Sequence, residues 1–329
     1  MYWYYKVLFG SVGLAILLLL GFVAYRNVPG LANAFSGGST DTSVEGVIVP
    51  ENPADSDTEN HGAEPVPPGS QHGTTPAGLD QASVQAVRQL MSVRKLIQEG
   101  ESKKAREICY EILDDPALQP YSEGWLQTVE ELSGINRTML FTDAPADNKV
   151  TYLVSSGDSV WKIAKQHNVT MTMVMKSNGI DPANGNVFPG QALKIFLADW
   201  NLQVSKTHRY LLLRDGDRIL IGYRIGIGRE DRTPVGTFRI DTKETEPAWT
   251  YKGIKYDFGH EKNVLGTRWM GLEVTGDTNS LLQGYGIHGT WVPESIGGTE
   301  SNGCIRMINS QVEELYDIVP YNTPVIIKE

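Results

Sequence analysis

The stretch RYLLLRDGDRILIGYRIGIG, which runs from Arg209 to Gly228, decides the fold of the C-terminal part of this chain. Two runs rich in Leu and Ile flank the pair Asp215-Gly216. An Asp-Gly pair between two apolar runs is a strong signal for a tight hairpin, because glycine supplies the positive φ that such turns need. The stretch therefore predicts two antiparallel strands.

More strands are predicted further along the same region. Short apolar runs bounded by turn residues recur at 233–241, 268–274 and 285–289, and a last run occupies 324–329. Residues 309–319 show helical spacing, and Ser310 with Glu313 forms a predicted capping box at the start of this helix. We therefore expect residues 202–329 to form a mainly β domain with one late helix.

Residues 149–197 show a different order of elements. Strands are predicted at 152–154 and 193–196. Between them, Ser159 and Thr170 each precede a short run with helical spacing, in the position of a helix N-cap. The segment therefore predicts a compact β-α-α-β unit.

The run YLVSSGDSVWKIAKQHNVTMTMVMKSNG, followed by VFPGQALKI, closely resembles the lysin motif (LysM) over almost its full length. This resemblance implies binding of N-acetylglucosamine-containing glycans in a shallow groove between two loops. The residues that it implies for the groove are Ser156, Gly157, Asp158, Ser159, Gly179, Ile180 and Asp181. The alternative is a degenerate motif that serves as a spacer, with Trp161 in its core.

The chain has two cysteines in different surroundings. Cys109 lies in the helix-like run REICYEIL, where a small apolar side chain in a helical core is its expected role. Cys304 lies in HGTWVPESIGGTESNGCIRM, downstream of His288 and directly after Gly303. A nucleophilic thiol needs a base, donors for the oxyanion that it creates and a tight backbone. This stretch offers all three, so Cys304 is the candidate nucleophile.

With RTPVGTFRI upstream, the stretch IHGTWVPESIGGTESNGCIRM closely resembles the YkuD-like L,D-transpeptidases of bacterial cell walls, and the resemblance covers residues 202–329. It implies a β-sandwich-like catalytic domain whose cysteine attacks the bond before D-alanine in a peptidoglycan tetrapeptide stem. D-Alanine leaves, and an amine of a neighbouring stem resolves the thioester. The resemblance implies that Cys304 is the nucleophile, that His288 is the base and that the amides of Gly303 and Cys304 form the oxyanion hole. It also implies substrate contacts for Arg306, Asn302, Gly289 and Ser301, and Ser301 is expected to support the loop as well.

One position departs from the family pattern, because Asn302 stands where the family often has histidine. Asparagine can form hydrogen bonds but cannot titrate near neutral pH. His288 is then the one histidine of the motif, and we expect a backbone carbonyl to orient its ring. Two alternatives stay open: His288 as a structural histidine, and Arg306 as a partner in a structural salt bridge.

Residues 1–26 contain an uncharged, mostly apolar run at 7–25. Its length is about what a helix needs to cross a hydrocarbon core of ~30 Å. We expect a retained transmembrane anchor, because the small-residue site Ala32-Asn33-Ala34 lies too far beyond the run for a cleaved signal peptide. Residues 27–78 are rich in Pro, Gly, Ser and acidic residues, which predicts a solvated linker.

Residues 79–142 are predicted to be helical. Apolar residues recur at helical spacing, Gly100 separates two helices, and a third begins at Ser122. The pattern G…KAREICYEIL faintly resembles a tetratricopeptide repeat, although stable arrays need about three units and only one and a fraction is present. The sequence leaves open whether this region binds a protein partner or is a spacer.

Composition narrows the choice of partner. A net charge of -10 and a pI near 5.2 argue against broad binding of nucleic acid or anionic lipid. No metal-ligand spacing or cofactor motif is found, and Ser92-x-x-Lys95 and Ser159-x-x-Lys162 lack the companion motifs of serine acyltransferases.

We expect a multidomain, single-pass protein of the cytoplasmic membrane whose C-terminal domains act on peptidoglycan in the periplasm or cell-wall space. The alternatives are an inactive wall-binding protein, a carboxypeptidase that uses water, and transfer to a lipoprotein lysine.

Overall fold

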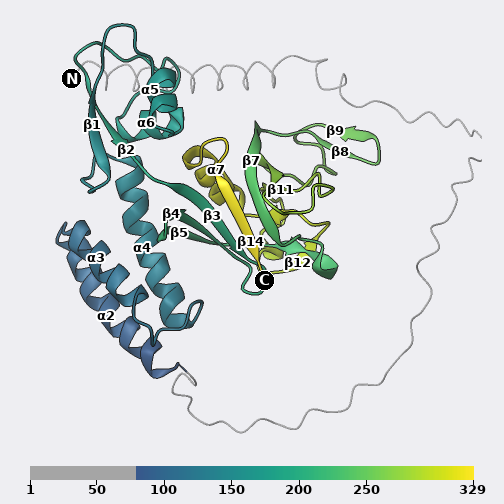
Figure 1. The fold of residues 1–329 in the computed structure, drawn as a ribbon, viewed down its shortest axis with the longest axis horizontal. Helices are drawn as coiled ribbons and strands as arrows, with labels where there is room; N and C mark the ends of the chain where they lie inside the picture. Colours follow the sequence, from purple (N-terminus) through teal and green to yellow (C-terminus); the bar gives the residue numbers. More distant parts are fainter. Residues whose placement is uncertain (1–78) are drawn as a thin grey trace, which may run out of the picture. The chain divides into compact units, whose positions relative to one another are not determined.

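A computed structural model describes residues 79–329 (Figure 1). The expected anchor at 1–26 and the expected linker at 27–78 both lie outside the described residues. Within the described part of the chain, no helix is both long enough and apolar enough to cross a bilayer.

The region after residue 79 forms three helices, as predicted. They are α2 (Gln81–Gln98), α3 (Ser102–Leu113) and α4 (Glu123–Phe141). Gly100 lies between the first two with φ of 79°, and Ser122 is the N-cap residue of the third. The predicted structural role of Cys109 is confirmed, because its side chain is buried in α3, where burial raises the pKa of the thiol to about 12.

The β-α-α-β unit is also confirmed. Antiparallel strands β1 (Lys149–Leu153) and β2 (Ala192–Phe196) enclose α5 (Val160–Gln166) and α6 (Met171–Ser177). Ser159 accepts a hydrogen bond from the Lys162 N–H, and Thr170 accepts one from the Met173 N–H. Both predicted N-caps therefore use their side chains as expected.

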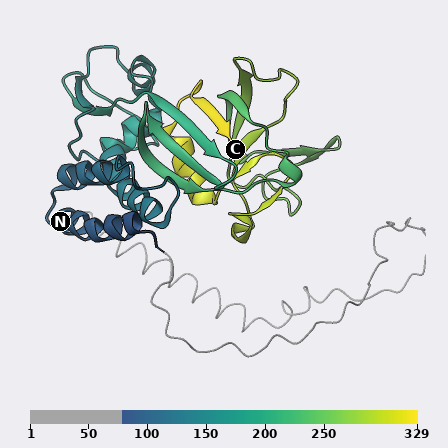
Figure 2. The same ribbon diagram turned by 60° about the horizontal axis from the view of Figure 1, so that its bottom comes forward.

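The C-terminal region is built on one curled eight-stranded sheet with the order β13-β11-β10-β7-β14-β3-β4-β5 (Figures 1 and 2). Its strands are β3 (Trp200–Ser205), β4 (Tyr210–Asp215), β5 (Arg218–Arg224), β7 (Gly236–Thr245), β10 (Arg268–Thr275), β11 (Gly286–His288), β13 (Ile305–Arg306) and β14 (Pro324–Lys328). The predicted hairpin at Asp215-Gly216 is confirmed. The sandwich-like arrangement is not found among the described residues, because β14 pairs with both β3 and β7 and joins the strands into a single sheet.

Smaller elements surround this sheet. A short pair joins β6 (Ile227–Gly228) to β12 (Thr299–Ser301), a separate hairpin contains β8 (Trp249–Tyr251) and β9 (Ile254–Tyr256), and the 3-10 turns are η1 (Arg229–Asp231) and η2 (Pro293–Ser295). Helix α7 (Asn309–Ile318) lies where predicted, but the Ser310–Glu313 capping box is wrong. The N-cap residue is Ile308, two residues before the predicted one, so Ser310 already lies inside the first turn.

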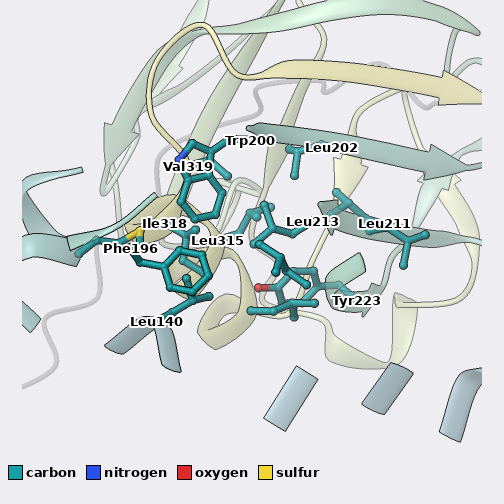
Figure 3. Packing of buried hydrophobic residues seen from close by; sticks show 14 of the residues in the cluster. Leu140, Phe196, Trp200, Leu202, Leu211, Leu213, Tyr223, Leu315, Ile318 and Val319 are labelled. Atoms are coloured by element: carbon teal, nitrogen blue, oxygen red, sulfur yellow. The ribbon is translucent and has the colours of Figure 1, made fainter. Parts of the chain in front are cut away.

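Buried side chains from all three regions form one core. Figure 3 shows Leu140 of α4, Phe196 of β2, Leu213 of β4 and Leu315 of α7 within a single cluster. The helical region, the β-α-α-β unit and the sheet therefore pack against each other, so residues 79–142 are more than a spacer.

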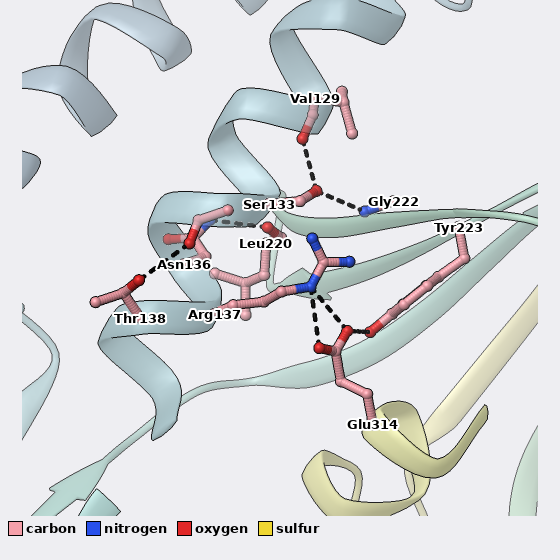
Figure 4. Close-up of polar contacts among 10 residues, drawn as sticks. Val129, Ser133, Asn136, Arg137, Thr138, Leu220, Gly222, Tyr223 and Glu314 are labelled. Carbon is pink, nitrogen blue, oxygen red and sulfur yellow. Dashed lines mark hydrogen bonds and ion pairs between the residues drawn. The ribbon is translucent and has the colours of Figure 1, made fainter. Parts of the chain in front are cut away.

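Helices α3 and α4 cover the edge strand β5. The Tyr110 hydroxyl donates to the Ile219 carbonyl at 3.0 Å, and the Asn136 amide donates to the Leu220 carbonyl at 2.8 Å. Ser133 accepts the Gly222 N–H at 3.1 Å (Figure 4). An open edge strand presents unpaired backbone groups that invite association with other chains. These contacts satisfy part of that edge.

Glu314 of α7 links α4 to β5 (Figure 4). Its carboxylate accepts two hydrogen bonds of 3.0 Å from Arg137 Nε and one of 2.8 Å from the Tyr223 hydroxyl. Tyr223 is fully buried, and this burial, reinforced by the Glu314 charge, raises the pKa of the phenol well above its usual value. Removing the carboxylate would leave both donors without their acceptor.

We therefore expect Glu314→Ala to lower the free energy of unfolding by about 2 kcal/mol, because it strands a buried hydroxyl and a half-buried guanidinium. Urea unfolding measures the loss, and amide hydrogen exchange should accelerate in α4 first. Glu313→Ala is the matched control, since this neighbour in α7 makes no side-chain hydrogen bond within residues 79–329. Equal losses in the two variants would contradict the assigned role of Glu314.

Candidate active site

Adjacent strands bring the predicted catalytic residues together. Strand β13 lies parallel to β11, with Arg306 opposite His288 in register. Side chains at the same register of neighbouring strands emerge on one face, and alternate residues of a strand share a face. Cys304, two residues before Arg306, therefore falls on the face that carries His288.

This face opens into a cleft of about 300 Å³. His288 and Cys304 both line it, and so do Ser301, Asn302 and Arg306. The cleft walls also include Trp249 of the β8–β9 hairpin and three residues that follow Gly289 in the chain, which are Thr290, Trp291 and Val292. Five of the residues expected from the sequence therefore share one cavity.

His288 is oriented by a backbone carbonyl, as expected. Its Nδ1 lies 2.6 Å from the Gly289 carbonyl oxygen. A carbonyl only accepts, so Nδ1 carries the proton and Nε2 keeps its lone pair. Burial lowers the pKa of the imidazole to about 4, and the Arg306 charge adds to this effect, while hydrogen bonds to the backbone of Gly289 and Leu265 oppose it. His288 is therefore neutral at physiological pH and able to accept a proton.

Gly289 is required at its position for steric reasons. A Cβ on this residue would lie 2.1 Å from Oδ1 of Asn309 and 3.1 Å from the Thr267 nitrogen. The same Asn309 oxygen accepts a hydrogen bond from that Thr267 N–H at 3.2 Å. Gly289 was expected to contact the substrate. The structure shows a further role, because its carbonyl orients the His288 ring.

The Cys304 thiol is neutral at physiological pH. Its Sγ lies 3.7 Å from the Gly284 carbonyl oxygen. Burial raises the pKa of the thiol, and a backbone hydrogen bond with Gly286 opposes that rise. The cleft therefore holds a neutral thiol and a neutral imidazole, so attack by the sulfur requires removal of the thiol proton.

Ser301 supports the loop before the cysteine, as expected. Its hydroxyl accepts the Gly303 N–H at 3.1 Å and donates to the Cys304 carbonyl at 2.6 Å. The Gly303 N–H is therefore already engaged, and the expectation that it serves the oxyanion does not fit this geometry. Among the described residues, the Cys304 N–H has no hydrogen-bond partner and is the remaining backbone donor of the expected pair.

Thr233 is a site residue to which the sequence gave no role. Its hydroxyl donates to the Gly303 carbonyl at 2.9 Å and accepts the Gly228 N–H at 2.8 Å. Gly303 itself has φ of 134°, and a Cβ there would lie 2.7 Å from the Tyr285 ring. The usable signal was the run RTPVGTFRI, which contains Thr233 and continues into the strand β7.

Asn302 and Arg306 make different contacts at the rim. Asn302 Oδ1 accepts a hydrogen bond of 3.0 Å from Arg229, so an arginine orients the amide that replaces the family's frequent histidine. Arg306 lies 3.4 Å from the Glu300 carboxylate, which is the salt bridge considered as an alternative. Its Nε is buried without a hydrogen-bond partner in the described part of the chain. Arg306 therefore both lines the cleft and forms a long ion pair with Glu300.

The residues expected to bind glycan have mixed surroundings. Asp158 accepts hydrogen bonds from the Tyr152 hydroxyl at 2.9 Å and the Ser155 N–H at 2.8 Å, so it shapes its own turn. Ile180 is buried, whereas Asp181 is exposed and caps the following turn. Trp161 is 55% exposed, which makes its placement in the core wrong. The turn glycines Gly157 and Gly179 both adopt positive φ, and Ser156, which precedes Gly157 in the chain, is exposed.

No group of three or more His, Cys, Asp or Glu side chains suited to hold a metal ion occurs between residues 79 and 329.

Comparisons with known proteins agree with this division of the chain. A family model described as the L,D-transpeptidase catalytic domain, YkuD, matches residues 200–327, and a LysM domain model matches residues 152–196. A Bacillus subtilis (strain 168) protein provisionally named L,D-transpeptidase YqjB is 33% identical over 159 residues, which cover 48% of this chain and 83% of that relative. A second protein of that strain, provisionally named L,D-transpeptidase YkuD, is 30% identical over 184 residues, or 54% of this chain and 98% of the relative. The solved catalytic domain of an E. faecium L,D-transpeptidase acylated by ertapenem is 25% identical, covers 40% of this chain and 98% of its own, and has a TM-score of 0.31.

Proposed function

Because the chain belongs to the YkuD family of L,D-transpeptidases, we propose that it transfers an acyl group of a peptidoglycan tetrapeptide stem to an amine through Cys304. The observation that carries the proposal is the shared cleft, where the thiol lies on the same face as a neutral imidazole whose orientation is fixed by Gly289. A partly buried thiol and a buried histidine in one cleft fit nucleophilic catalysis better than a purely structural role.

The proposed reaction proceeds in two acyl transfers. Cys304 Sγ attacks the carbonyl carbon before D-alanine as His288 Nε2 takes the thiol proton, and the Cys304 N–H stabilises the oxyanion. The C–N bond then breaks, the imidazolium returns its proton to the leaving amine of D-alanine, and a thioester remains. An acceptor amine attacks the thioester carbonyl and gives up a proton to His288. The new C–N bond forms, the C–S bond breaks, and the imidazolium returns the proton to the Cys304 thiolate.

Incubation of soluble protein with tetrapeptide-rich wall tests this proposal. Mass spectrometry of the released muropeptides should show cross-linked dimers together with free D-alanine. Tripeptides without dimers would indicate water as acceptor, so the chain would be a carboxypeptidase. Unchanged tetrapeptides would favour an inactive wall-binding protein.

We also propose that the LysM unit holds the enzyme on glycan strands, and that residues 1–26 anchor the chain in the cytoplasmic membrane with its C-terminal domains outside. The LysM proposal rests on the family match at 152–196 and on exposed loop residues such as Ser156 and Asp181. The location of peptidoglycan supports this orientation of the chain, because the polymer lies outside the cytoplasmic membrane, on the side proposed for the C-terminal domains.

The glycan interaction predicts retention of the protein on peptidoglycan from which the peptides have been removed. Soluble N-acetylglucosamine oligomers should release it, because they compete for the same groove. A co-sedimentation assay measures both effects, and Cys304→Ala protein avoids covalent capture. Retention only on peptide-bearing wall would overturn the LysM assignment.

A further inference from the structure

A second and larger cleft lies between α4 and the catalytic sheet. It has a volume of about 740 Å³ and shares no lining residue with the Cys304 cleft. One wall is a single face of α4, because its lining residues follow helical spacing: Glu123, Leu126, Gln127, Glu130 and Arg137. The opposite wall comes from the sheet, η2 and the start of α7: Tyr210, Gly222, Arg224, Pro293, Ile296, Ile308 and Gln311.

Charged side chains of both signs in this cleft have no partner among residues 79–329. Glu130 and Arg224 are exposed, and neither makes a side-chain hydrogen bond or ion pair within residues 79–329. Glu123 is contacted by Gln127 at 2.7 Å, through an uncharged amide. Arg137 differs, because Glu314 already neutralises it. The cleft therefore offers two carboxylates and one guanidinium to a ligand.

One end of the cleft is an aromatic surface that includes Tyr121 and His208. Tyr121 stacks on His208 with ring centres 4.0 Å apart and planes 8° from parallel, and it also contacts Trp125 and Tyr210. Tyr121 has φ of 64°, which is unfavourable for a bulky residue. Strained residues held by their surroundings are concentrated at binding sites. This strain is consistent with a preformed end wall.

The same loop that carries the active site separates the two clefts. Thr290, Trp291 and Val292 line the Cys304 cleft, whereas the next residue, Pro293, and Ile296 line the larger one. Arg224 also lies close behind this loop, since a Cβ on Gly297 would be 3.4 Å from its guanidinium. A ligand in the larger cleft would thus lie behind the wall of the catalytic cleft.

We propose that the larger cleft binds a second stem peptide of the cell wall, as a site distinct from the one where Cys304 reacts. The inference rests on the proposed function, which makes peptidoglycan the polymer at hand. A stem peptide carries both ammonium and carboxylate groups, which match Glu123 or Glu130 and Arg224. A nucleic acid would need a basic cleft, and an acyl chain would need an apolar one. Binding two stems of one polymer would raise its effective concentration at Cys304.

The test measures binding of a free tetrapeptide stem to full-length Cys304→Ala protein by calorimetry. Adding Glu130→Gln and Arg224→Gln should raise the Kd of this second site at least about fivefold, because two exposed charge pairs are lost. Arg88→Gln with Glu111→Gln is the matched control, since both residues are exposed on α2 and α3 and lie outside the cleft. An unchanged Kd in the cleft variant, or an equal rise in the control, would overturn the proposal.

NMR gives a second readout that needs no cleft variant. The same peptide should shift the methyl signals of Ile296 and Ile308, which line the cleft. Shifts confined to residues around Cys304 would place the peptide in the catalytic cleft alone and would refute a second site. Acylation of wild-type Cys304 is measured separately. If acylation fails while the two isoleucines shift, the proposed function is wrong and the peptide site stands.

Discussion

Cys304→Ala should abolish acylation by a carbapenem, with a loss of at least about 10⁴-fold relative to wild type. The reason is that the substitution removes the nucleophile, and no other side chain in the cleft carries a thiol. Intact-protein mass spectrometry after prolonged incubation measures the adduct directly. Wild-type protein should gain the mass of one carbapenem, and the variant should keep its own mass.

Cys109→Ala is the matched control for that experiment. Cys109 is buried in the helical core, and burial raises the pKa of its thiol to about 12, so it has almost no thiolate near neutral pH. This variant should acylate at the wild-type rate. An adduct on the Cys304→Ala protein, or loss of the adduct in the Cys109→Ala protein, would refute Cys304 as the nucleophile.

Features that depend on a few neighbouring residues could be predicted from the sequence. The caps at Ser159 and Thr170 form hydrogen bonds to N–H groups three residues ahead, and the Asp215-Gly216 turn joins adjacent strands. The capping box at Ser310 failed although it is equally local. The same side-chain pattern fits more than one helix start, so the boundary was not determined by pattern alone.

Features that join distant segments could not be predicted. The sequence shows six strand-like runs in the C-terminal region but not that β14 pairs with both β3 and β7, which replaces the sandwich with one sheet. It also gave no sign that Ser301 would engage the Gly303 N–H, because this depends on the folded loop. From the sequence, Cys304 and His288 could be assigned to one site only through the family resemblance. The pairing of β11 with β13 explains physically why the two residues lie in the same site.

The helical region illustrates the same limit. Its three helices followed from residue spacing, whereas its docking on β5 relies on Asn136 and Ser133, whose partners lie 84 and 89 residues away. Polar residues on a helix are ordinarily expected to face solvent. Here they satisfy backbone groups of an edge strand, and the same helix forms one wall of the larger cleft.

His288→Gln should slow acylation by about 10²–10⁴-fold near neutral pH, because it removes the general base. The pH dependence gives a sharper signature. Since burial lowers the pKa of His288 to about 4 and raises that of Cys304, wild type holds a thiol and a neutral imidazole over most of the range from about pH 5 to 9. The acylation rate of the wild-type protein should therefore fall only as the pH approaches 4, and it should be nearly independent of pH above that.

The His288→Gln variant should behave differently over the same range. Without a base it can react only through thiolate formed by direct ionisation, so its rate should rise about tenfold per pH unit until the thiol titrates. Asn302→Ala is the comparison, since it removes one hydrogen bond with Arg229 and should cost only about fivefold with the wild-type pH profile kept. Stopped-flow acylation of each variant, after confirming its fold by circular dichroism, measures these profiles. A flat profile in His288→Gln at near wild-type rate, or a larger loss in Asn302→Ala, would mean that the thiol proton leaves by a route other than His288.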